Sequence, residues 1–492
     1  MITKLFYTIH RILGTLLSIL FFMWFVSGIV MIYHYFPQAN AKEKMEKLES
    51  LPASLPSVEE LLTRIPDSCL VEGISVNKYL GQTTFKVDTD KGTFTLPADS
   101  AGQLPEINWN YITQVAHLWC DAPIAKVDSL YHLEQWIPFN SLKKHFPIYK
   151  FHFSDDAETE LYISSHTGEV LQQTNGSERF WSWIGAIPHW VYFTQLRQDA
   201  DLWMKSVIWL SAIGCLMTIA GLYVGIHAYC ASRKRSKILH SPYKKKWYYW
   251  HHVTGVVFGL FVLTWVFSGM MSLADVPEWI GKTEQTYPVR KIMDENTPLL
   301  SDYPLDYRKV IADYKGKATS LEWGHFRSVP LYHLYLGSKK VTVDASSTSV
   351  KPLNLTEAQV TEAVKAIHGE DARMQVELLT EYDNYYTARS GHLALPVWKV
   401  AVNNADKTCY YINPSNGSYR DYNTHKRWGF WMYSGMHSLR FKFLIEHPML
   451  WTIVIWTLLL GGATVSLTGI VLGMRYLKRL CRRKKTTVHR LD

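Results

Sequence analysis

Four apolar stretches interrupt a chain of 492 residues that is otherwise rich in polar positions. They lie at roughly residues 10–33, 204–229, 251–273 and 449–475. Each holds about 20 or more predominantly apolar residues, which is the length that crosses the hydrocarbon core of a bilayer. The sequence therefore predicts an α-helical membrane protein with four transmembrane helices and two large segments outside the membrane, 34–203 and 274–448.

The first and third apolar stretches share one residue pattern at a constant offset of 241 positions. The shared residues are His10, Gly14, Trp24, Ser27 and Gly28, which match His251, Gly255, Trp265, Ser268 and Gly269. The second and fourth stretches match at an offset of 248, from Arg179, Trp183, His189, Leu196, Trp203, Gly214, Gly221 and Gly225 to Arg427, Trp431, His437, Leu444, Trp451, Gly462, Gly469 and Gly473. Each half then reads helix, outside segment, helix, in one orientation, which predicts two parallel repeats about an axis along the membrane normal. The GxxxG spacings in stretches two and four are typical of close helix packing.

The outside segments repeat as well, at an offset of 249. Pro147–Phe151 followed by Leu161–Ile163 has the alternation of a β-hairpin, and Pro396–Val400 followed by Tyr410–Ile412 repeats it. With helical stretches such as Thr356–Ile367 ahead of the hairpins, these segments predict small α+β modules, one or two per half. The predicted organisation is helix 1 over 1–33, outside region A over 34–178, a pre-helix and helix 2 over 179–230, a basic loop over 231–247, helix 3 over 248–273, outside region B over 274–426, a pre-helix and helix 4 over 427–476, and a basic tail over 477–492.

The net charge of +9 is concentrated beside the apolar stretches, in the segments 231–247 and 477–492. By the positive-inside rule both segments lie in the cytoplasm, with both termini, and the long segments lie outside, in the periplasm of a Gram-negative bacterium. This distribution indicates topology and not nucleic-acid binding. Six scattered cysteines form no CxxC pair, which argues against a zinc or iron–sulfur motif, although Cys69 and Cys120 are candidates for a disulfide. The chain has no HExxH, no P-loop and no GxGxxG after a strand, so a zinc protease or a nucleotide site is not indicated.

The sequence resembles the PepSY-associated transmembrane family, which includes iron-regulated membrane proteins and ferric-siderophore reductases. The resemblance rests on His10-Arg11-Ile12-Leu13-Gly14, the Ser27-Gly28 helix exit, the turn Thr167-Gly168-Glu169-Val170, and His189 and His437 ahead of glycine-bearing helices. It implies PepSY modules in the periplasm and, in reductase members, two b-type haems. His252 stands where that family usually has an arginine after the first histidine.

The histidines at the ends of the helices are the candidate ligands. His10 and His251 lie at the cytoplasmic ends of stretches one and three, whereas His189 and His437 lie on the outer side. Because a helix rises 1.5 Å per residue, opposite ends of a span are roughly 30 Å apart, so His10 cannot share an iron with His189. His10 with His251 then makes one predicted haem site and His189 with His437 the other, since imidazole is a standard axial ligand. A lone interfacial histidine is more often an ordinary polar residue; the symmetric pairs favour ligation.

Further residues are candidates with weaker support. Arg11, Arg179 and Arg427 could pair with haem propionates, because guanidinium binds carboxylate bidentately; for Arg11 the topology signal is an equal explanation. His34 and His227 are alternate ligands, with interfacial anchoring as the other reading. Glycine one turn after His10 and His251 would leave room for a flat macrocycle, although such a stripe is more often helix packing.

Two classes of function remain open. The first is an inner-membrane di-haem b-type reductase that passes electrons from quinol or a cytoplasmic reductase to a periplasmic acceptor, with ferric-siderophore iron as the expected substrate. The second is a haem-free anchor whose PepSY modules bind peptides or restrain a protease. A transporter is less favoured, because the apolar stretches are nearly free of charge at mid-depth.

Overall fold

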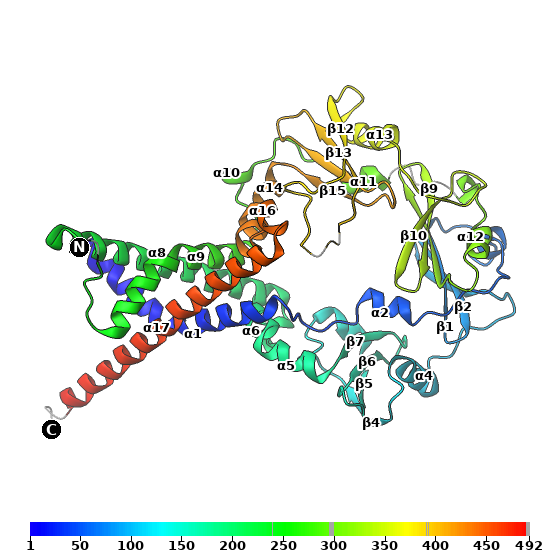
Figure 1. Cartoon of the computed structure of the whole chain (residues 1–492). Coiled ribbons are helices and arrows are strands. Elements are labelled where there is room, and N and C mark those ends of the chain that lie inside the picture. The colour runs from blue at the N-terminus through cyan, green and yellow to red at the C-terminus, as the bar shows by residue number, and fades with distance from the viewer. Residues whose placement is uncertain (239, 295–299, 390, 392, 489–492) are drawn as a thin grey trace.

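The computed structural model describes residues 1–238, 240–294, 300–389, 391 and 393–488. It consists of a bundle of long helices and, at one end of the bundle, a ring of three lobes (Figure 1). We call this end of the bundle the lobe end. The opposite end, where both termini and the loop between α8 and α9 lie, is called the tail end.

Four helices of the bundle are long and apolar enough to cross a membrane: α1 (Ile2–Met31), α8 (Ala200–Ser236), α9 (Lys246–Met271) and α17 (Pro448–Val488). They confirm the four predicted spans; each helix begins before its predicted start, α8 and α17 also run past their predicted ends, and α1 and α9 end two residues earlier than predicted. The helices α1 and α9 each pack against both α8 and α17. Equivalent helices of the two halves therefore sit diagonally, and α1 and α9 face each other across the middle of the bundle.

Shorter helices connect the bundle to the lobes and cover the sheets. They are α2 (Ala41–Glu46), α3 (Val58–Leu62), α4 (Trp109–Trp119), α5 (Gly176–Ile184), α6 (Ala186–Trp190), α7 (Thr194–Arg197), α10 (Glu278–Gly281), α11 (Val289–Asp294), α12 (Tyr307–Asp313), α13 (Glu357–His368), α14 (Thr424–Phe430), α15 (Met436–Ser438) and α16 (Lys442–Ile445). Asparagine or threonine side chains cap α4, α5, α13 and α14 at their first turns, as the free N–H groups there require.

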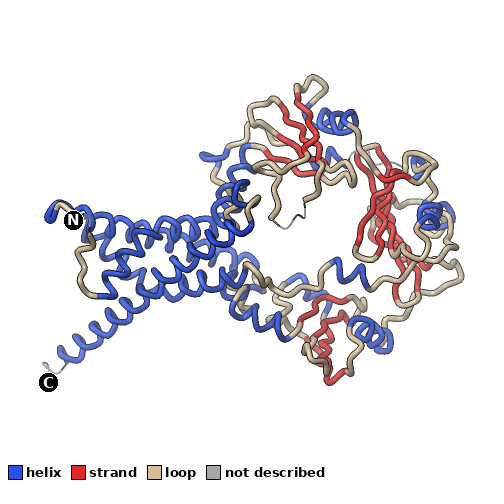
Figure 2. The backbone as a smooth tube through the Cα atoms, in the orientation of Figure 1, coloured by secondary structure: helices blue, strands red, loops and turns tan. Residues whose placement is uncertain are grey.

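Two of the lobes contain four-stranded antiparallel sheets with the same strand order. Lobe A is formed by β4 (Ile124–Leu130), β5 (Ile148–Phe153), β6 (Glu160–Ser164) and β7 (Val170–Thr174). Lobe B is formed by β12 (Met374–Leu379), β13 (Val397–Val402), β14 (Cys409–Ile412) and β15 (Tyr419–Tyr422). The hairpins β5–β6 and β13–β14 are those that the alternating pattern predicts, and the α+β character of the outside regions is confirmed. Figure 2 shows these strands apart from the helical bundle.

The third lobe draws strands from both outside segments. Its seven-stranded sheet has the order β11-β10-β9-β8-β1-β2-β3, and the bounds are β1 (Val71–Tyr79), β2 (Gln82–Thr89), β3 (Gly92–Pro97), β8 (Ser320–Phe326), β9 (Val329–Leu336), β10 (Lys339–Asp344) and β11 (Lys351–Pro352). The two segments join where β1 pairs with β8, with Val76 opposite Leu321. We call it the shared lobe.

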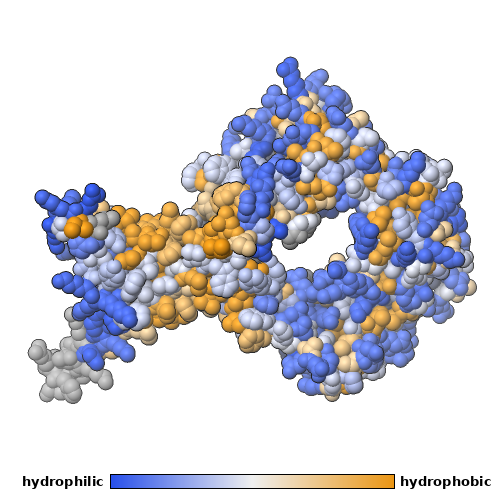
Figure 3. Space-filling model, viewed as in Figure 1, coloured by the Kyte–Doolittle hydropathy of each residue, from blue (hydrophilic) through white to orange (hydrophobic). Residues whose placement is uncertain are grey.

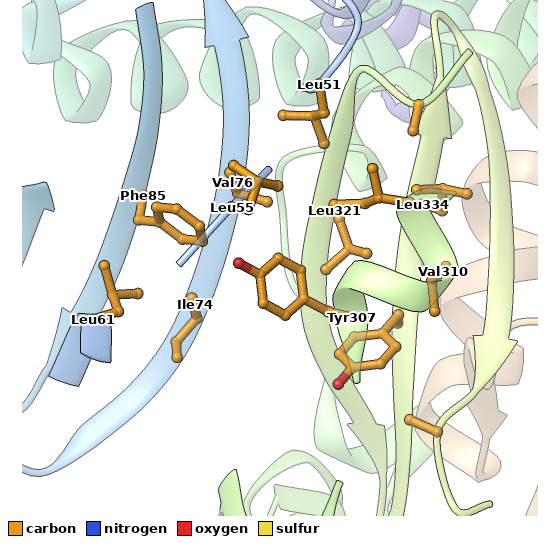
Figure 4. Close-up of a cluster of buried hydrophobic side chains, with 14 of the residues drawn as sticks. Leu51, Leu55, Leu61, Ile74, Val76, Phe85, Tyr307, Val310, Leu321 and Leu334 are labelled. Carbon is orange, nitrogen blue, oxygen red and sulfur yellow. The ribbon is translucent and has the colours of Figure 1, made fainter. Parts of the chain in front are cut away.

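The core of the shared lobe explains why the two segments associate. Val76 and Phe85 from the first segment pack in one buried cluster with Tyr307 and Leu321 from the second (Figure 4). The strands of either segment alone would expose an apolar sheet face to water. Burial of this face therefore favours the association of the two segments. The shared lobe closes the ring, and an opening remains between the lobes in the space-filling view (Figure 3).

The candidate disulfide between Cys69 and Cys120 is not formed. All six cysteines are free. The physical reason is location, because Cys69 packs against the core of the shared lobe whereas Cys120 packs against the core of lobe A.

Candidate functional site

The first candidate site is a pair of histidines inside the tail half of the bundle. His10 of α1 and His251 of α9 face each other with ring centres 6.0 Å apart and planes 29° from parallel. Each ring is held by the neighbouring long helix of its own half. Nδ1 of His10 lies 3.1 Å from the carbonyl oxygen of Met217 on α8, and Nδ1 of His251 lies 3.0 Å from Oγ1 of Thr468 on α17.

The second candidate site is a matching pair at the lobe end. His189 of α6 and His437 of α15 also have ring centres 6.0 Å apart. Nδ1 of His189 lies 3.1 Å from Oγ of Ser27, and Nδ1 of His437 lies 3.0 Å from Oγ of Ser268. The short helices α6 and α15 pack on the ends of α1 and α9 respectively, which places these serines beside the rings.

A backbone carbonyl faces each of the four rings and indicates its tautomer. Nδ1 of His10 lies 3.1 Å from the carbonyl oxygen of Met217, and Nδ1 of His189 lies 3.2 Å from that of Trp24. His251 and His437 bond to the backbone of Val465 and Trp265 in the same way. A carbonyl oxygen only accepts, so the ring nitrogen that faces it donates. Each Nδ1 therefore holds the proton, and Nε2 keeps a lone pair that no described residue engages. Orientation of a ligating histidine through its other nitrogen is the usual arrangement at metal sites.

The spacing within each pair fits two ligands on opposite sides of one metal. A metal–imidazole bond is about 2 Å long, so two rings that bind one metal from opposite faces have centres about 6 Å apart. Both pairs meet this distance. Among the described residues there is no group of three or more His, Cys, Asp or Glu side chains that could hold a metal ion. The pairs can therefore supply two axial ligands, and the remaining coordination positions would have to come from a planar ligand such as a macrocycle.

A cavity of about 420 Å³ surrounds the His10–His251 pair. Its volume lies in the range of small-molecule and cofactor sites. Gly14 and Gly255, one helical turn after the histidines, line it, and a Cβ placed on Gly255 would meet nothing within 4 Å. A Cβ on Gly221, in contrast, would lie 2.6 Å from Cε1 of His10. Glycines thus keep the cavity open on one side and let α8 approach the His10 ring on the other.

The rim of this cavity is basic and aromatic. The guanidinium of Arg11 lies 4.9 Å from the ring centre of Tyr476, and Arg479 donates to the hydroxyl of Tyr248 at 2.8 Å. Both arginines line the cavity. They can bind carboxylate groups that reach the rim, because guanidinium pairs with carboxylate through two parallel hydrogen bonds.

The other predicted candidates are placed away from the two pairs. His34 stacks on Trp181 at 4.5 Å, and His227 is an exposed residue on α8 that lies 6.1 Å from the ring of Tyr223. His252 lines the cavity but is fully engaged, with Nδ1 2.8 Å from Ser241 Oγ and Nε2 2.9 Å from the carbonyl of Gly225. It fastens the loop between α8 and α9 to the bundle.

Arg179 and Arg427 are engaged inside the lobes. Arg179 donates to Thr174 Oγ1 and to the carbonyl of Glu158 in lobe A, and Arg427 donates to the carbonyls of Asp406 and Lys407 in lobe B. Their guanidinium groups hold the hairpin turns that precede the pairs of histidines in sequence. The structure therefore gives them a role in lobe architecture and offers no observation that links them to propionates.

Sequence reasoning missed the residues that orient the histidines. Ser27 and Ser268 belong to a Ser-Gly dipeptide that recurs at the ends of the first and third apolar stretches, and this repetition was the only sign in the sequence that they matter. Thr468 and Arg479 have no counterpart at the offset that relates the halves, since positions 220 and 231 are both alanine. Only the folded bundle brings these residues to the site.

The protein is therefore an integral membrane protein that has two histidine pairs inside its helical bundle and α+β lobes outside it. The model of the PepSY-associated TM region matches residues 8–369, which is about three quarters of the chain. The chain belongs to this family. A search of curated proteins finds no match.

Proposed function

We propose that this protein is an inner-membrane di-haem b-type reductase that passes electrons across the bilayer to a periplasmic acceptor, with ferric-siderophore iron as its substrate. The two histidine pairs, His10–His251 and His189–His437, support the proposal most directly. They lie at two depths of one bundle, each with 6.0 Å between ring centres and each with Nε2 unengaged by described residues.

The residues fit haem b at both levels. Two axial imidazoles are what a six-coordinate, electron-transferring haem requires, and no third protein ligand is needed. At the tail end, the glycine-lined cavity leaves room for a flat ring, and Arg11 and Arg479 would hold its propionates. Toward the lobe end, Trp24 precedes Ser27 by about one turn of α1, and its Nε1 is buried without a hydrogen-bond partner among the described residues. When bound, haem supplies reversible one-electron transfer between its ferrous and ferric states.

The chain itself sets the spacing and the insulation of the electron path. Seventeen residues of α1 separate His10 from Ser27, which corresponds to about 26 Å along the helix axis. Phe21, Trp24, Phe25 and Trp265 pack between these levels, with ring centres 5.8 Å apart for Phe21–Trp24 and 5.7 Å apart for Phe25–Trp265. This apolar filling excludes water between the two levels.

The direction follows from the basic segments at the tail end, which we assign to the cytoplasm by the positive-inside rule. The lobes are then periplasmic and both termini cytoplasmic. A quinol or a cytoplasmic reductase donates electrons, and each Fe(III) takes one electron to become Fe(II). A quinol, which gives two electrons and releases two protons, therefore serves two ferric ions. Fe(II) binds hard oxygen ligands more weakly, so the metal is released from the siderophore.

The experiment uses the purified chain reduced with dithionite, freed of excess reductant, and mixed with a ferric chelate in the presence of a ferrous-specific chromophore. We expect reoxidation of the haem to match the appearance of Fe(II) mole for mole. His437→Ala should abolish rapid transfer to the chelate, and His10→Ala should remove the tail-end haem. His34→Ala and His227→Ala are matched controls, because both remove a histidine outside the pairs.

A chain that binds no haem when produced in haem-replete cells would contradict this function. The alternative, a haem-free anchor whose lobes bind peptides or restrain a protease, would then account for the fold. Haem that remains fully bound in all four single substitutions of the paired histidines would contradict the ligand assignment alone.

A further inference from the structure

Three arginines, two in lobe B and one shortly after His437, form no ion pair with a carboxylate among the described residues. They are Arg389, Arg420 and Arg440, of which the first two are exposed and the third is partly buried. Elsewhere in the lobes, basic residues such as Arg308 and Lys426 pair with acidic neighbours at 2.6 Å. Unpaired guanidinium groups held close together are a feature that needs an explanation.

Two of these arginines are held together by the chain beside His437. Arg440 lies three residues after His437 and donates to the carbonyl of Thr387. Arg389, two residues after Thr387, lies 4.1 Å from the ring centre of Trp451, whose Nε1 donates to the carbonyl of Ser438 at 3.0 Å. The segment that bears Arg389 is thus fastened to the segment that bears the histidine.

The hydroxyl of Thr387 is an unusual feature of the same place. Thr387 is 1% exposed, yet its Oγ1 has no hydrogen-bond partner among the described residues. A buried hydroxyl without a partner costs free energy, and such groups in native structures often mark a place where a ligand or water binds. This donor belongs to the same residue whose carbonyl accepts from Arg440.

Arg420 completes the group from strand β15. It stands opposite Tyr411 in the β14–β15 ladder and hydrogen-bonds Tyr422. The ring of Tyr422 lies 6.2 Å from that of Phe430, over which the guanidinium of Arg440 lies at 5.8 Å. Burial, together with the positive charge of Arg420, lowers the pKa of Arg440. Two like charges that repel each other in a partly buried place favour the binding of an anion between them.

The neighbouring carboxylates are already engaged. Asp383 accepts from the hydroxyl of Tyr411 at 2.6 Å and lies 3.4 Å from Lys399. Asp421 lies 2.6 Å from Nζ of Lys426. The three arginines therefore keep their positive charge available to a ligand.

The arginines are also absent from the matched positions of lobe A. At the offsets that relate the two halves, Arg389 and Arg440 correspond to Asn140 and Tyr192, and the place of Arg420 opposite Tyr411 is taken in lobe A by Gln172 opposite Tyr162. The buried polar residues of the lobes, in contrast, are kept in both: Glu134, Lys150 and Tyr162 of lobe A match Asp383, Lys399 and Tyr411 of lobe B. Since lobe A folds without the arginines, the fold does not require them.

We propose that Arg389, Arg420 and Arg440 form the docking site for the acceptor, and that the acceptor is a ferric chelate of net negative charge that binds beside His437 and not beside His189. The proposal rests on the reductase function proposed above. Arginine binds the carboxylate or phenolate oxygens of such a chelate in planar, bidentate geometry. The cluster also raises the local concentration of anions at the lobe end. Electron transfer to the chelate needs one electron per iron, which the reduced protein supplies.

The test measures binding and turnover separately. Ga(III)–citrate, which is redox-inert, probes binding by calorimetry, whereas Fe(III)–citrate and the uncharged Fe(III)–tris(acetohydroxamate) probe reduction. For Arg420→Gln and Arg440→Gln we expect at least a tenfold weaker affinity for Ga(III)–citrate and a tenfold higher KM for Fe(III)–citrate. The KM for the uncharged chelate should stay within twofold. Arg308→Gln, in the shared lobe, is the matched control that removes the same charge elsewhere.

Three results would overturn the proposal. Equal losses for the charged and uncharged chelates would indicate a structural defect. Unchanged values for both would show that the arginines do not bind the acceptor. Loss of the lobe-end haem, or a shift of its midpoint potential, would assign the arginines to haem propionates. A wild-type chain that lacks haem but still binds Ga(III)–citrate would contradict the reductase function and would still support an anion-binding site at the arginines. Failure of the reductase function can therefore be told apart from failure of the anion site.

Discussion

Gly221→Ala should remove the tail-end haem while leaving the bundle folded. Gly221 lies on α8 against the ring of His10, and it has ordinary helical backbone, so alanine is compatible with its conformation. A Cβ at this position would lie 2.6 Å from Cε1 and 2.7 Å from Nδ1 of His10. The imidazole must therefore move.

The required movement is large compared with what a metal bond tolerates. A carbon–carbon contact needs about 3.4 Å, so the ring has to shift by about 0.8 Å, whereas metal–ligand distances hold to about 0.2 Å. Overpacking of this kind costs about 1–3 kcal/mol, and part of it is offset because alanine favours the helix over glycine by about 1 kcal/mol. The fold should survive, and the ligand geometry should not.

The assay is haem content per chain by the pyridine haemochrome method, with a redox titration and a thermal unfolding curve on the same preparation. We expect Gly221→Ala to retain about one haem, that of the lobe end, with the unfolding temperature little changed. The matched control is Gly469→Ala, at the equivalent position of α17, where a Cβ would lie 3.6 Å from Cε1 of His251, an ordinary contact. This control should keep both haems.

The reasoning would be refuted by Gly221→Ala protein that binds both haems with unchanged potentials. It would also be refuted if Gly469→Ala lost its haem to the same extent, because the two contacts differ by 1 Å.

Three other predictions concern groups around the site and in the lobes. Ser27→Ala and Ser268→Ala each remove the hydroxyl contact of a lobe-end histidine and leave its contact with the carbonyl of Trp24 or Trp265, and we expect the affinity for the lobe-end haem to fall by up to about tenfold in titrations of the haem-depleted protein. His252→Ala removes the hydrogen bonds to Ser241 and to the carbonyl of Gly225 that fasten the loop to the bundle, and it should lower the free energy of unfolding by about 1–3 kcal/mol in denaturant titrations, without loss of haem; loss of haem would show that His252 is a ligand. In the shared lobe, burial lowers the pKa of His333 to about 4 from 6.5, so the unfolded chain binds more protons between these values and stability falls as the pH drops from 6.5 to 4, by about 3 kcal/mol at most. His333→Gln should flatten this part of the pH–stability curve, and an unchanged curve would contradict the assignment.

Much of the membrane part could be predicted from the chain because its signals are local. Apolar length defines the four helices, and the constant offsets match histidines of the two halves. The expected meeting of His10 with His251, and of His189 with His437, followed from the repeat that relates the two halves, and helix length excluded pairs from opposite ends of a span.

The shared lobe could not be predicted in this way. The pairing of Val76 with Leu321 joins residues 245 positions apart, and neither strand indicates its partner. Cys69 and Cys120 were matched by proximity in sequence, but the chain passes from the shared lobe to lobe A between them. The orienting role of Thr468 depended on the angle between α9 and α17, which local sequence does not determine.

The central claim is that each histidine pair binds one haem. The most direct measurement is the absorption spectrum of the detergent-purified chain, oxidised and then reduced with dithionite, with haem quantified per chain. We predict a b-type α-band at about two haems per chain, with one lost in His10→Ala and the other in His437→Ala. A colourless protein from haem-replete cells would contradict the account, and so would a haem content per chain that is unchanged by both substitutions.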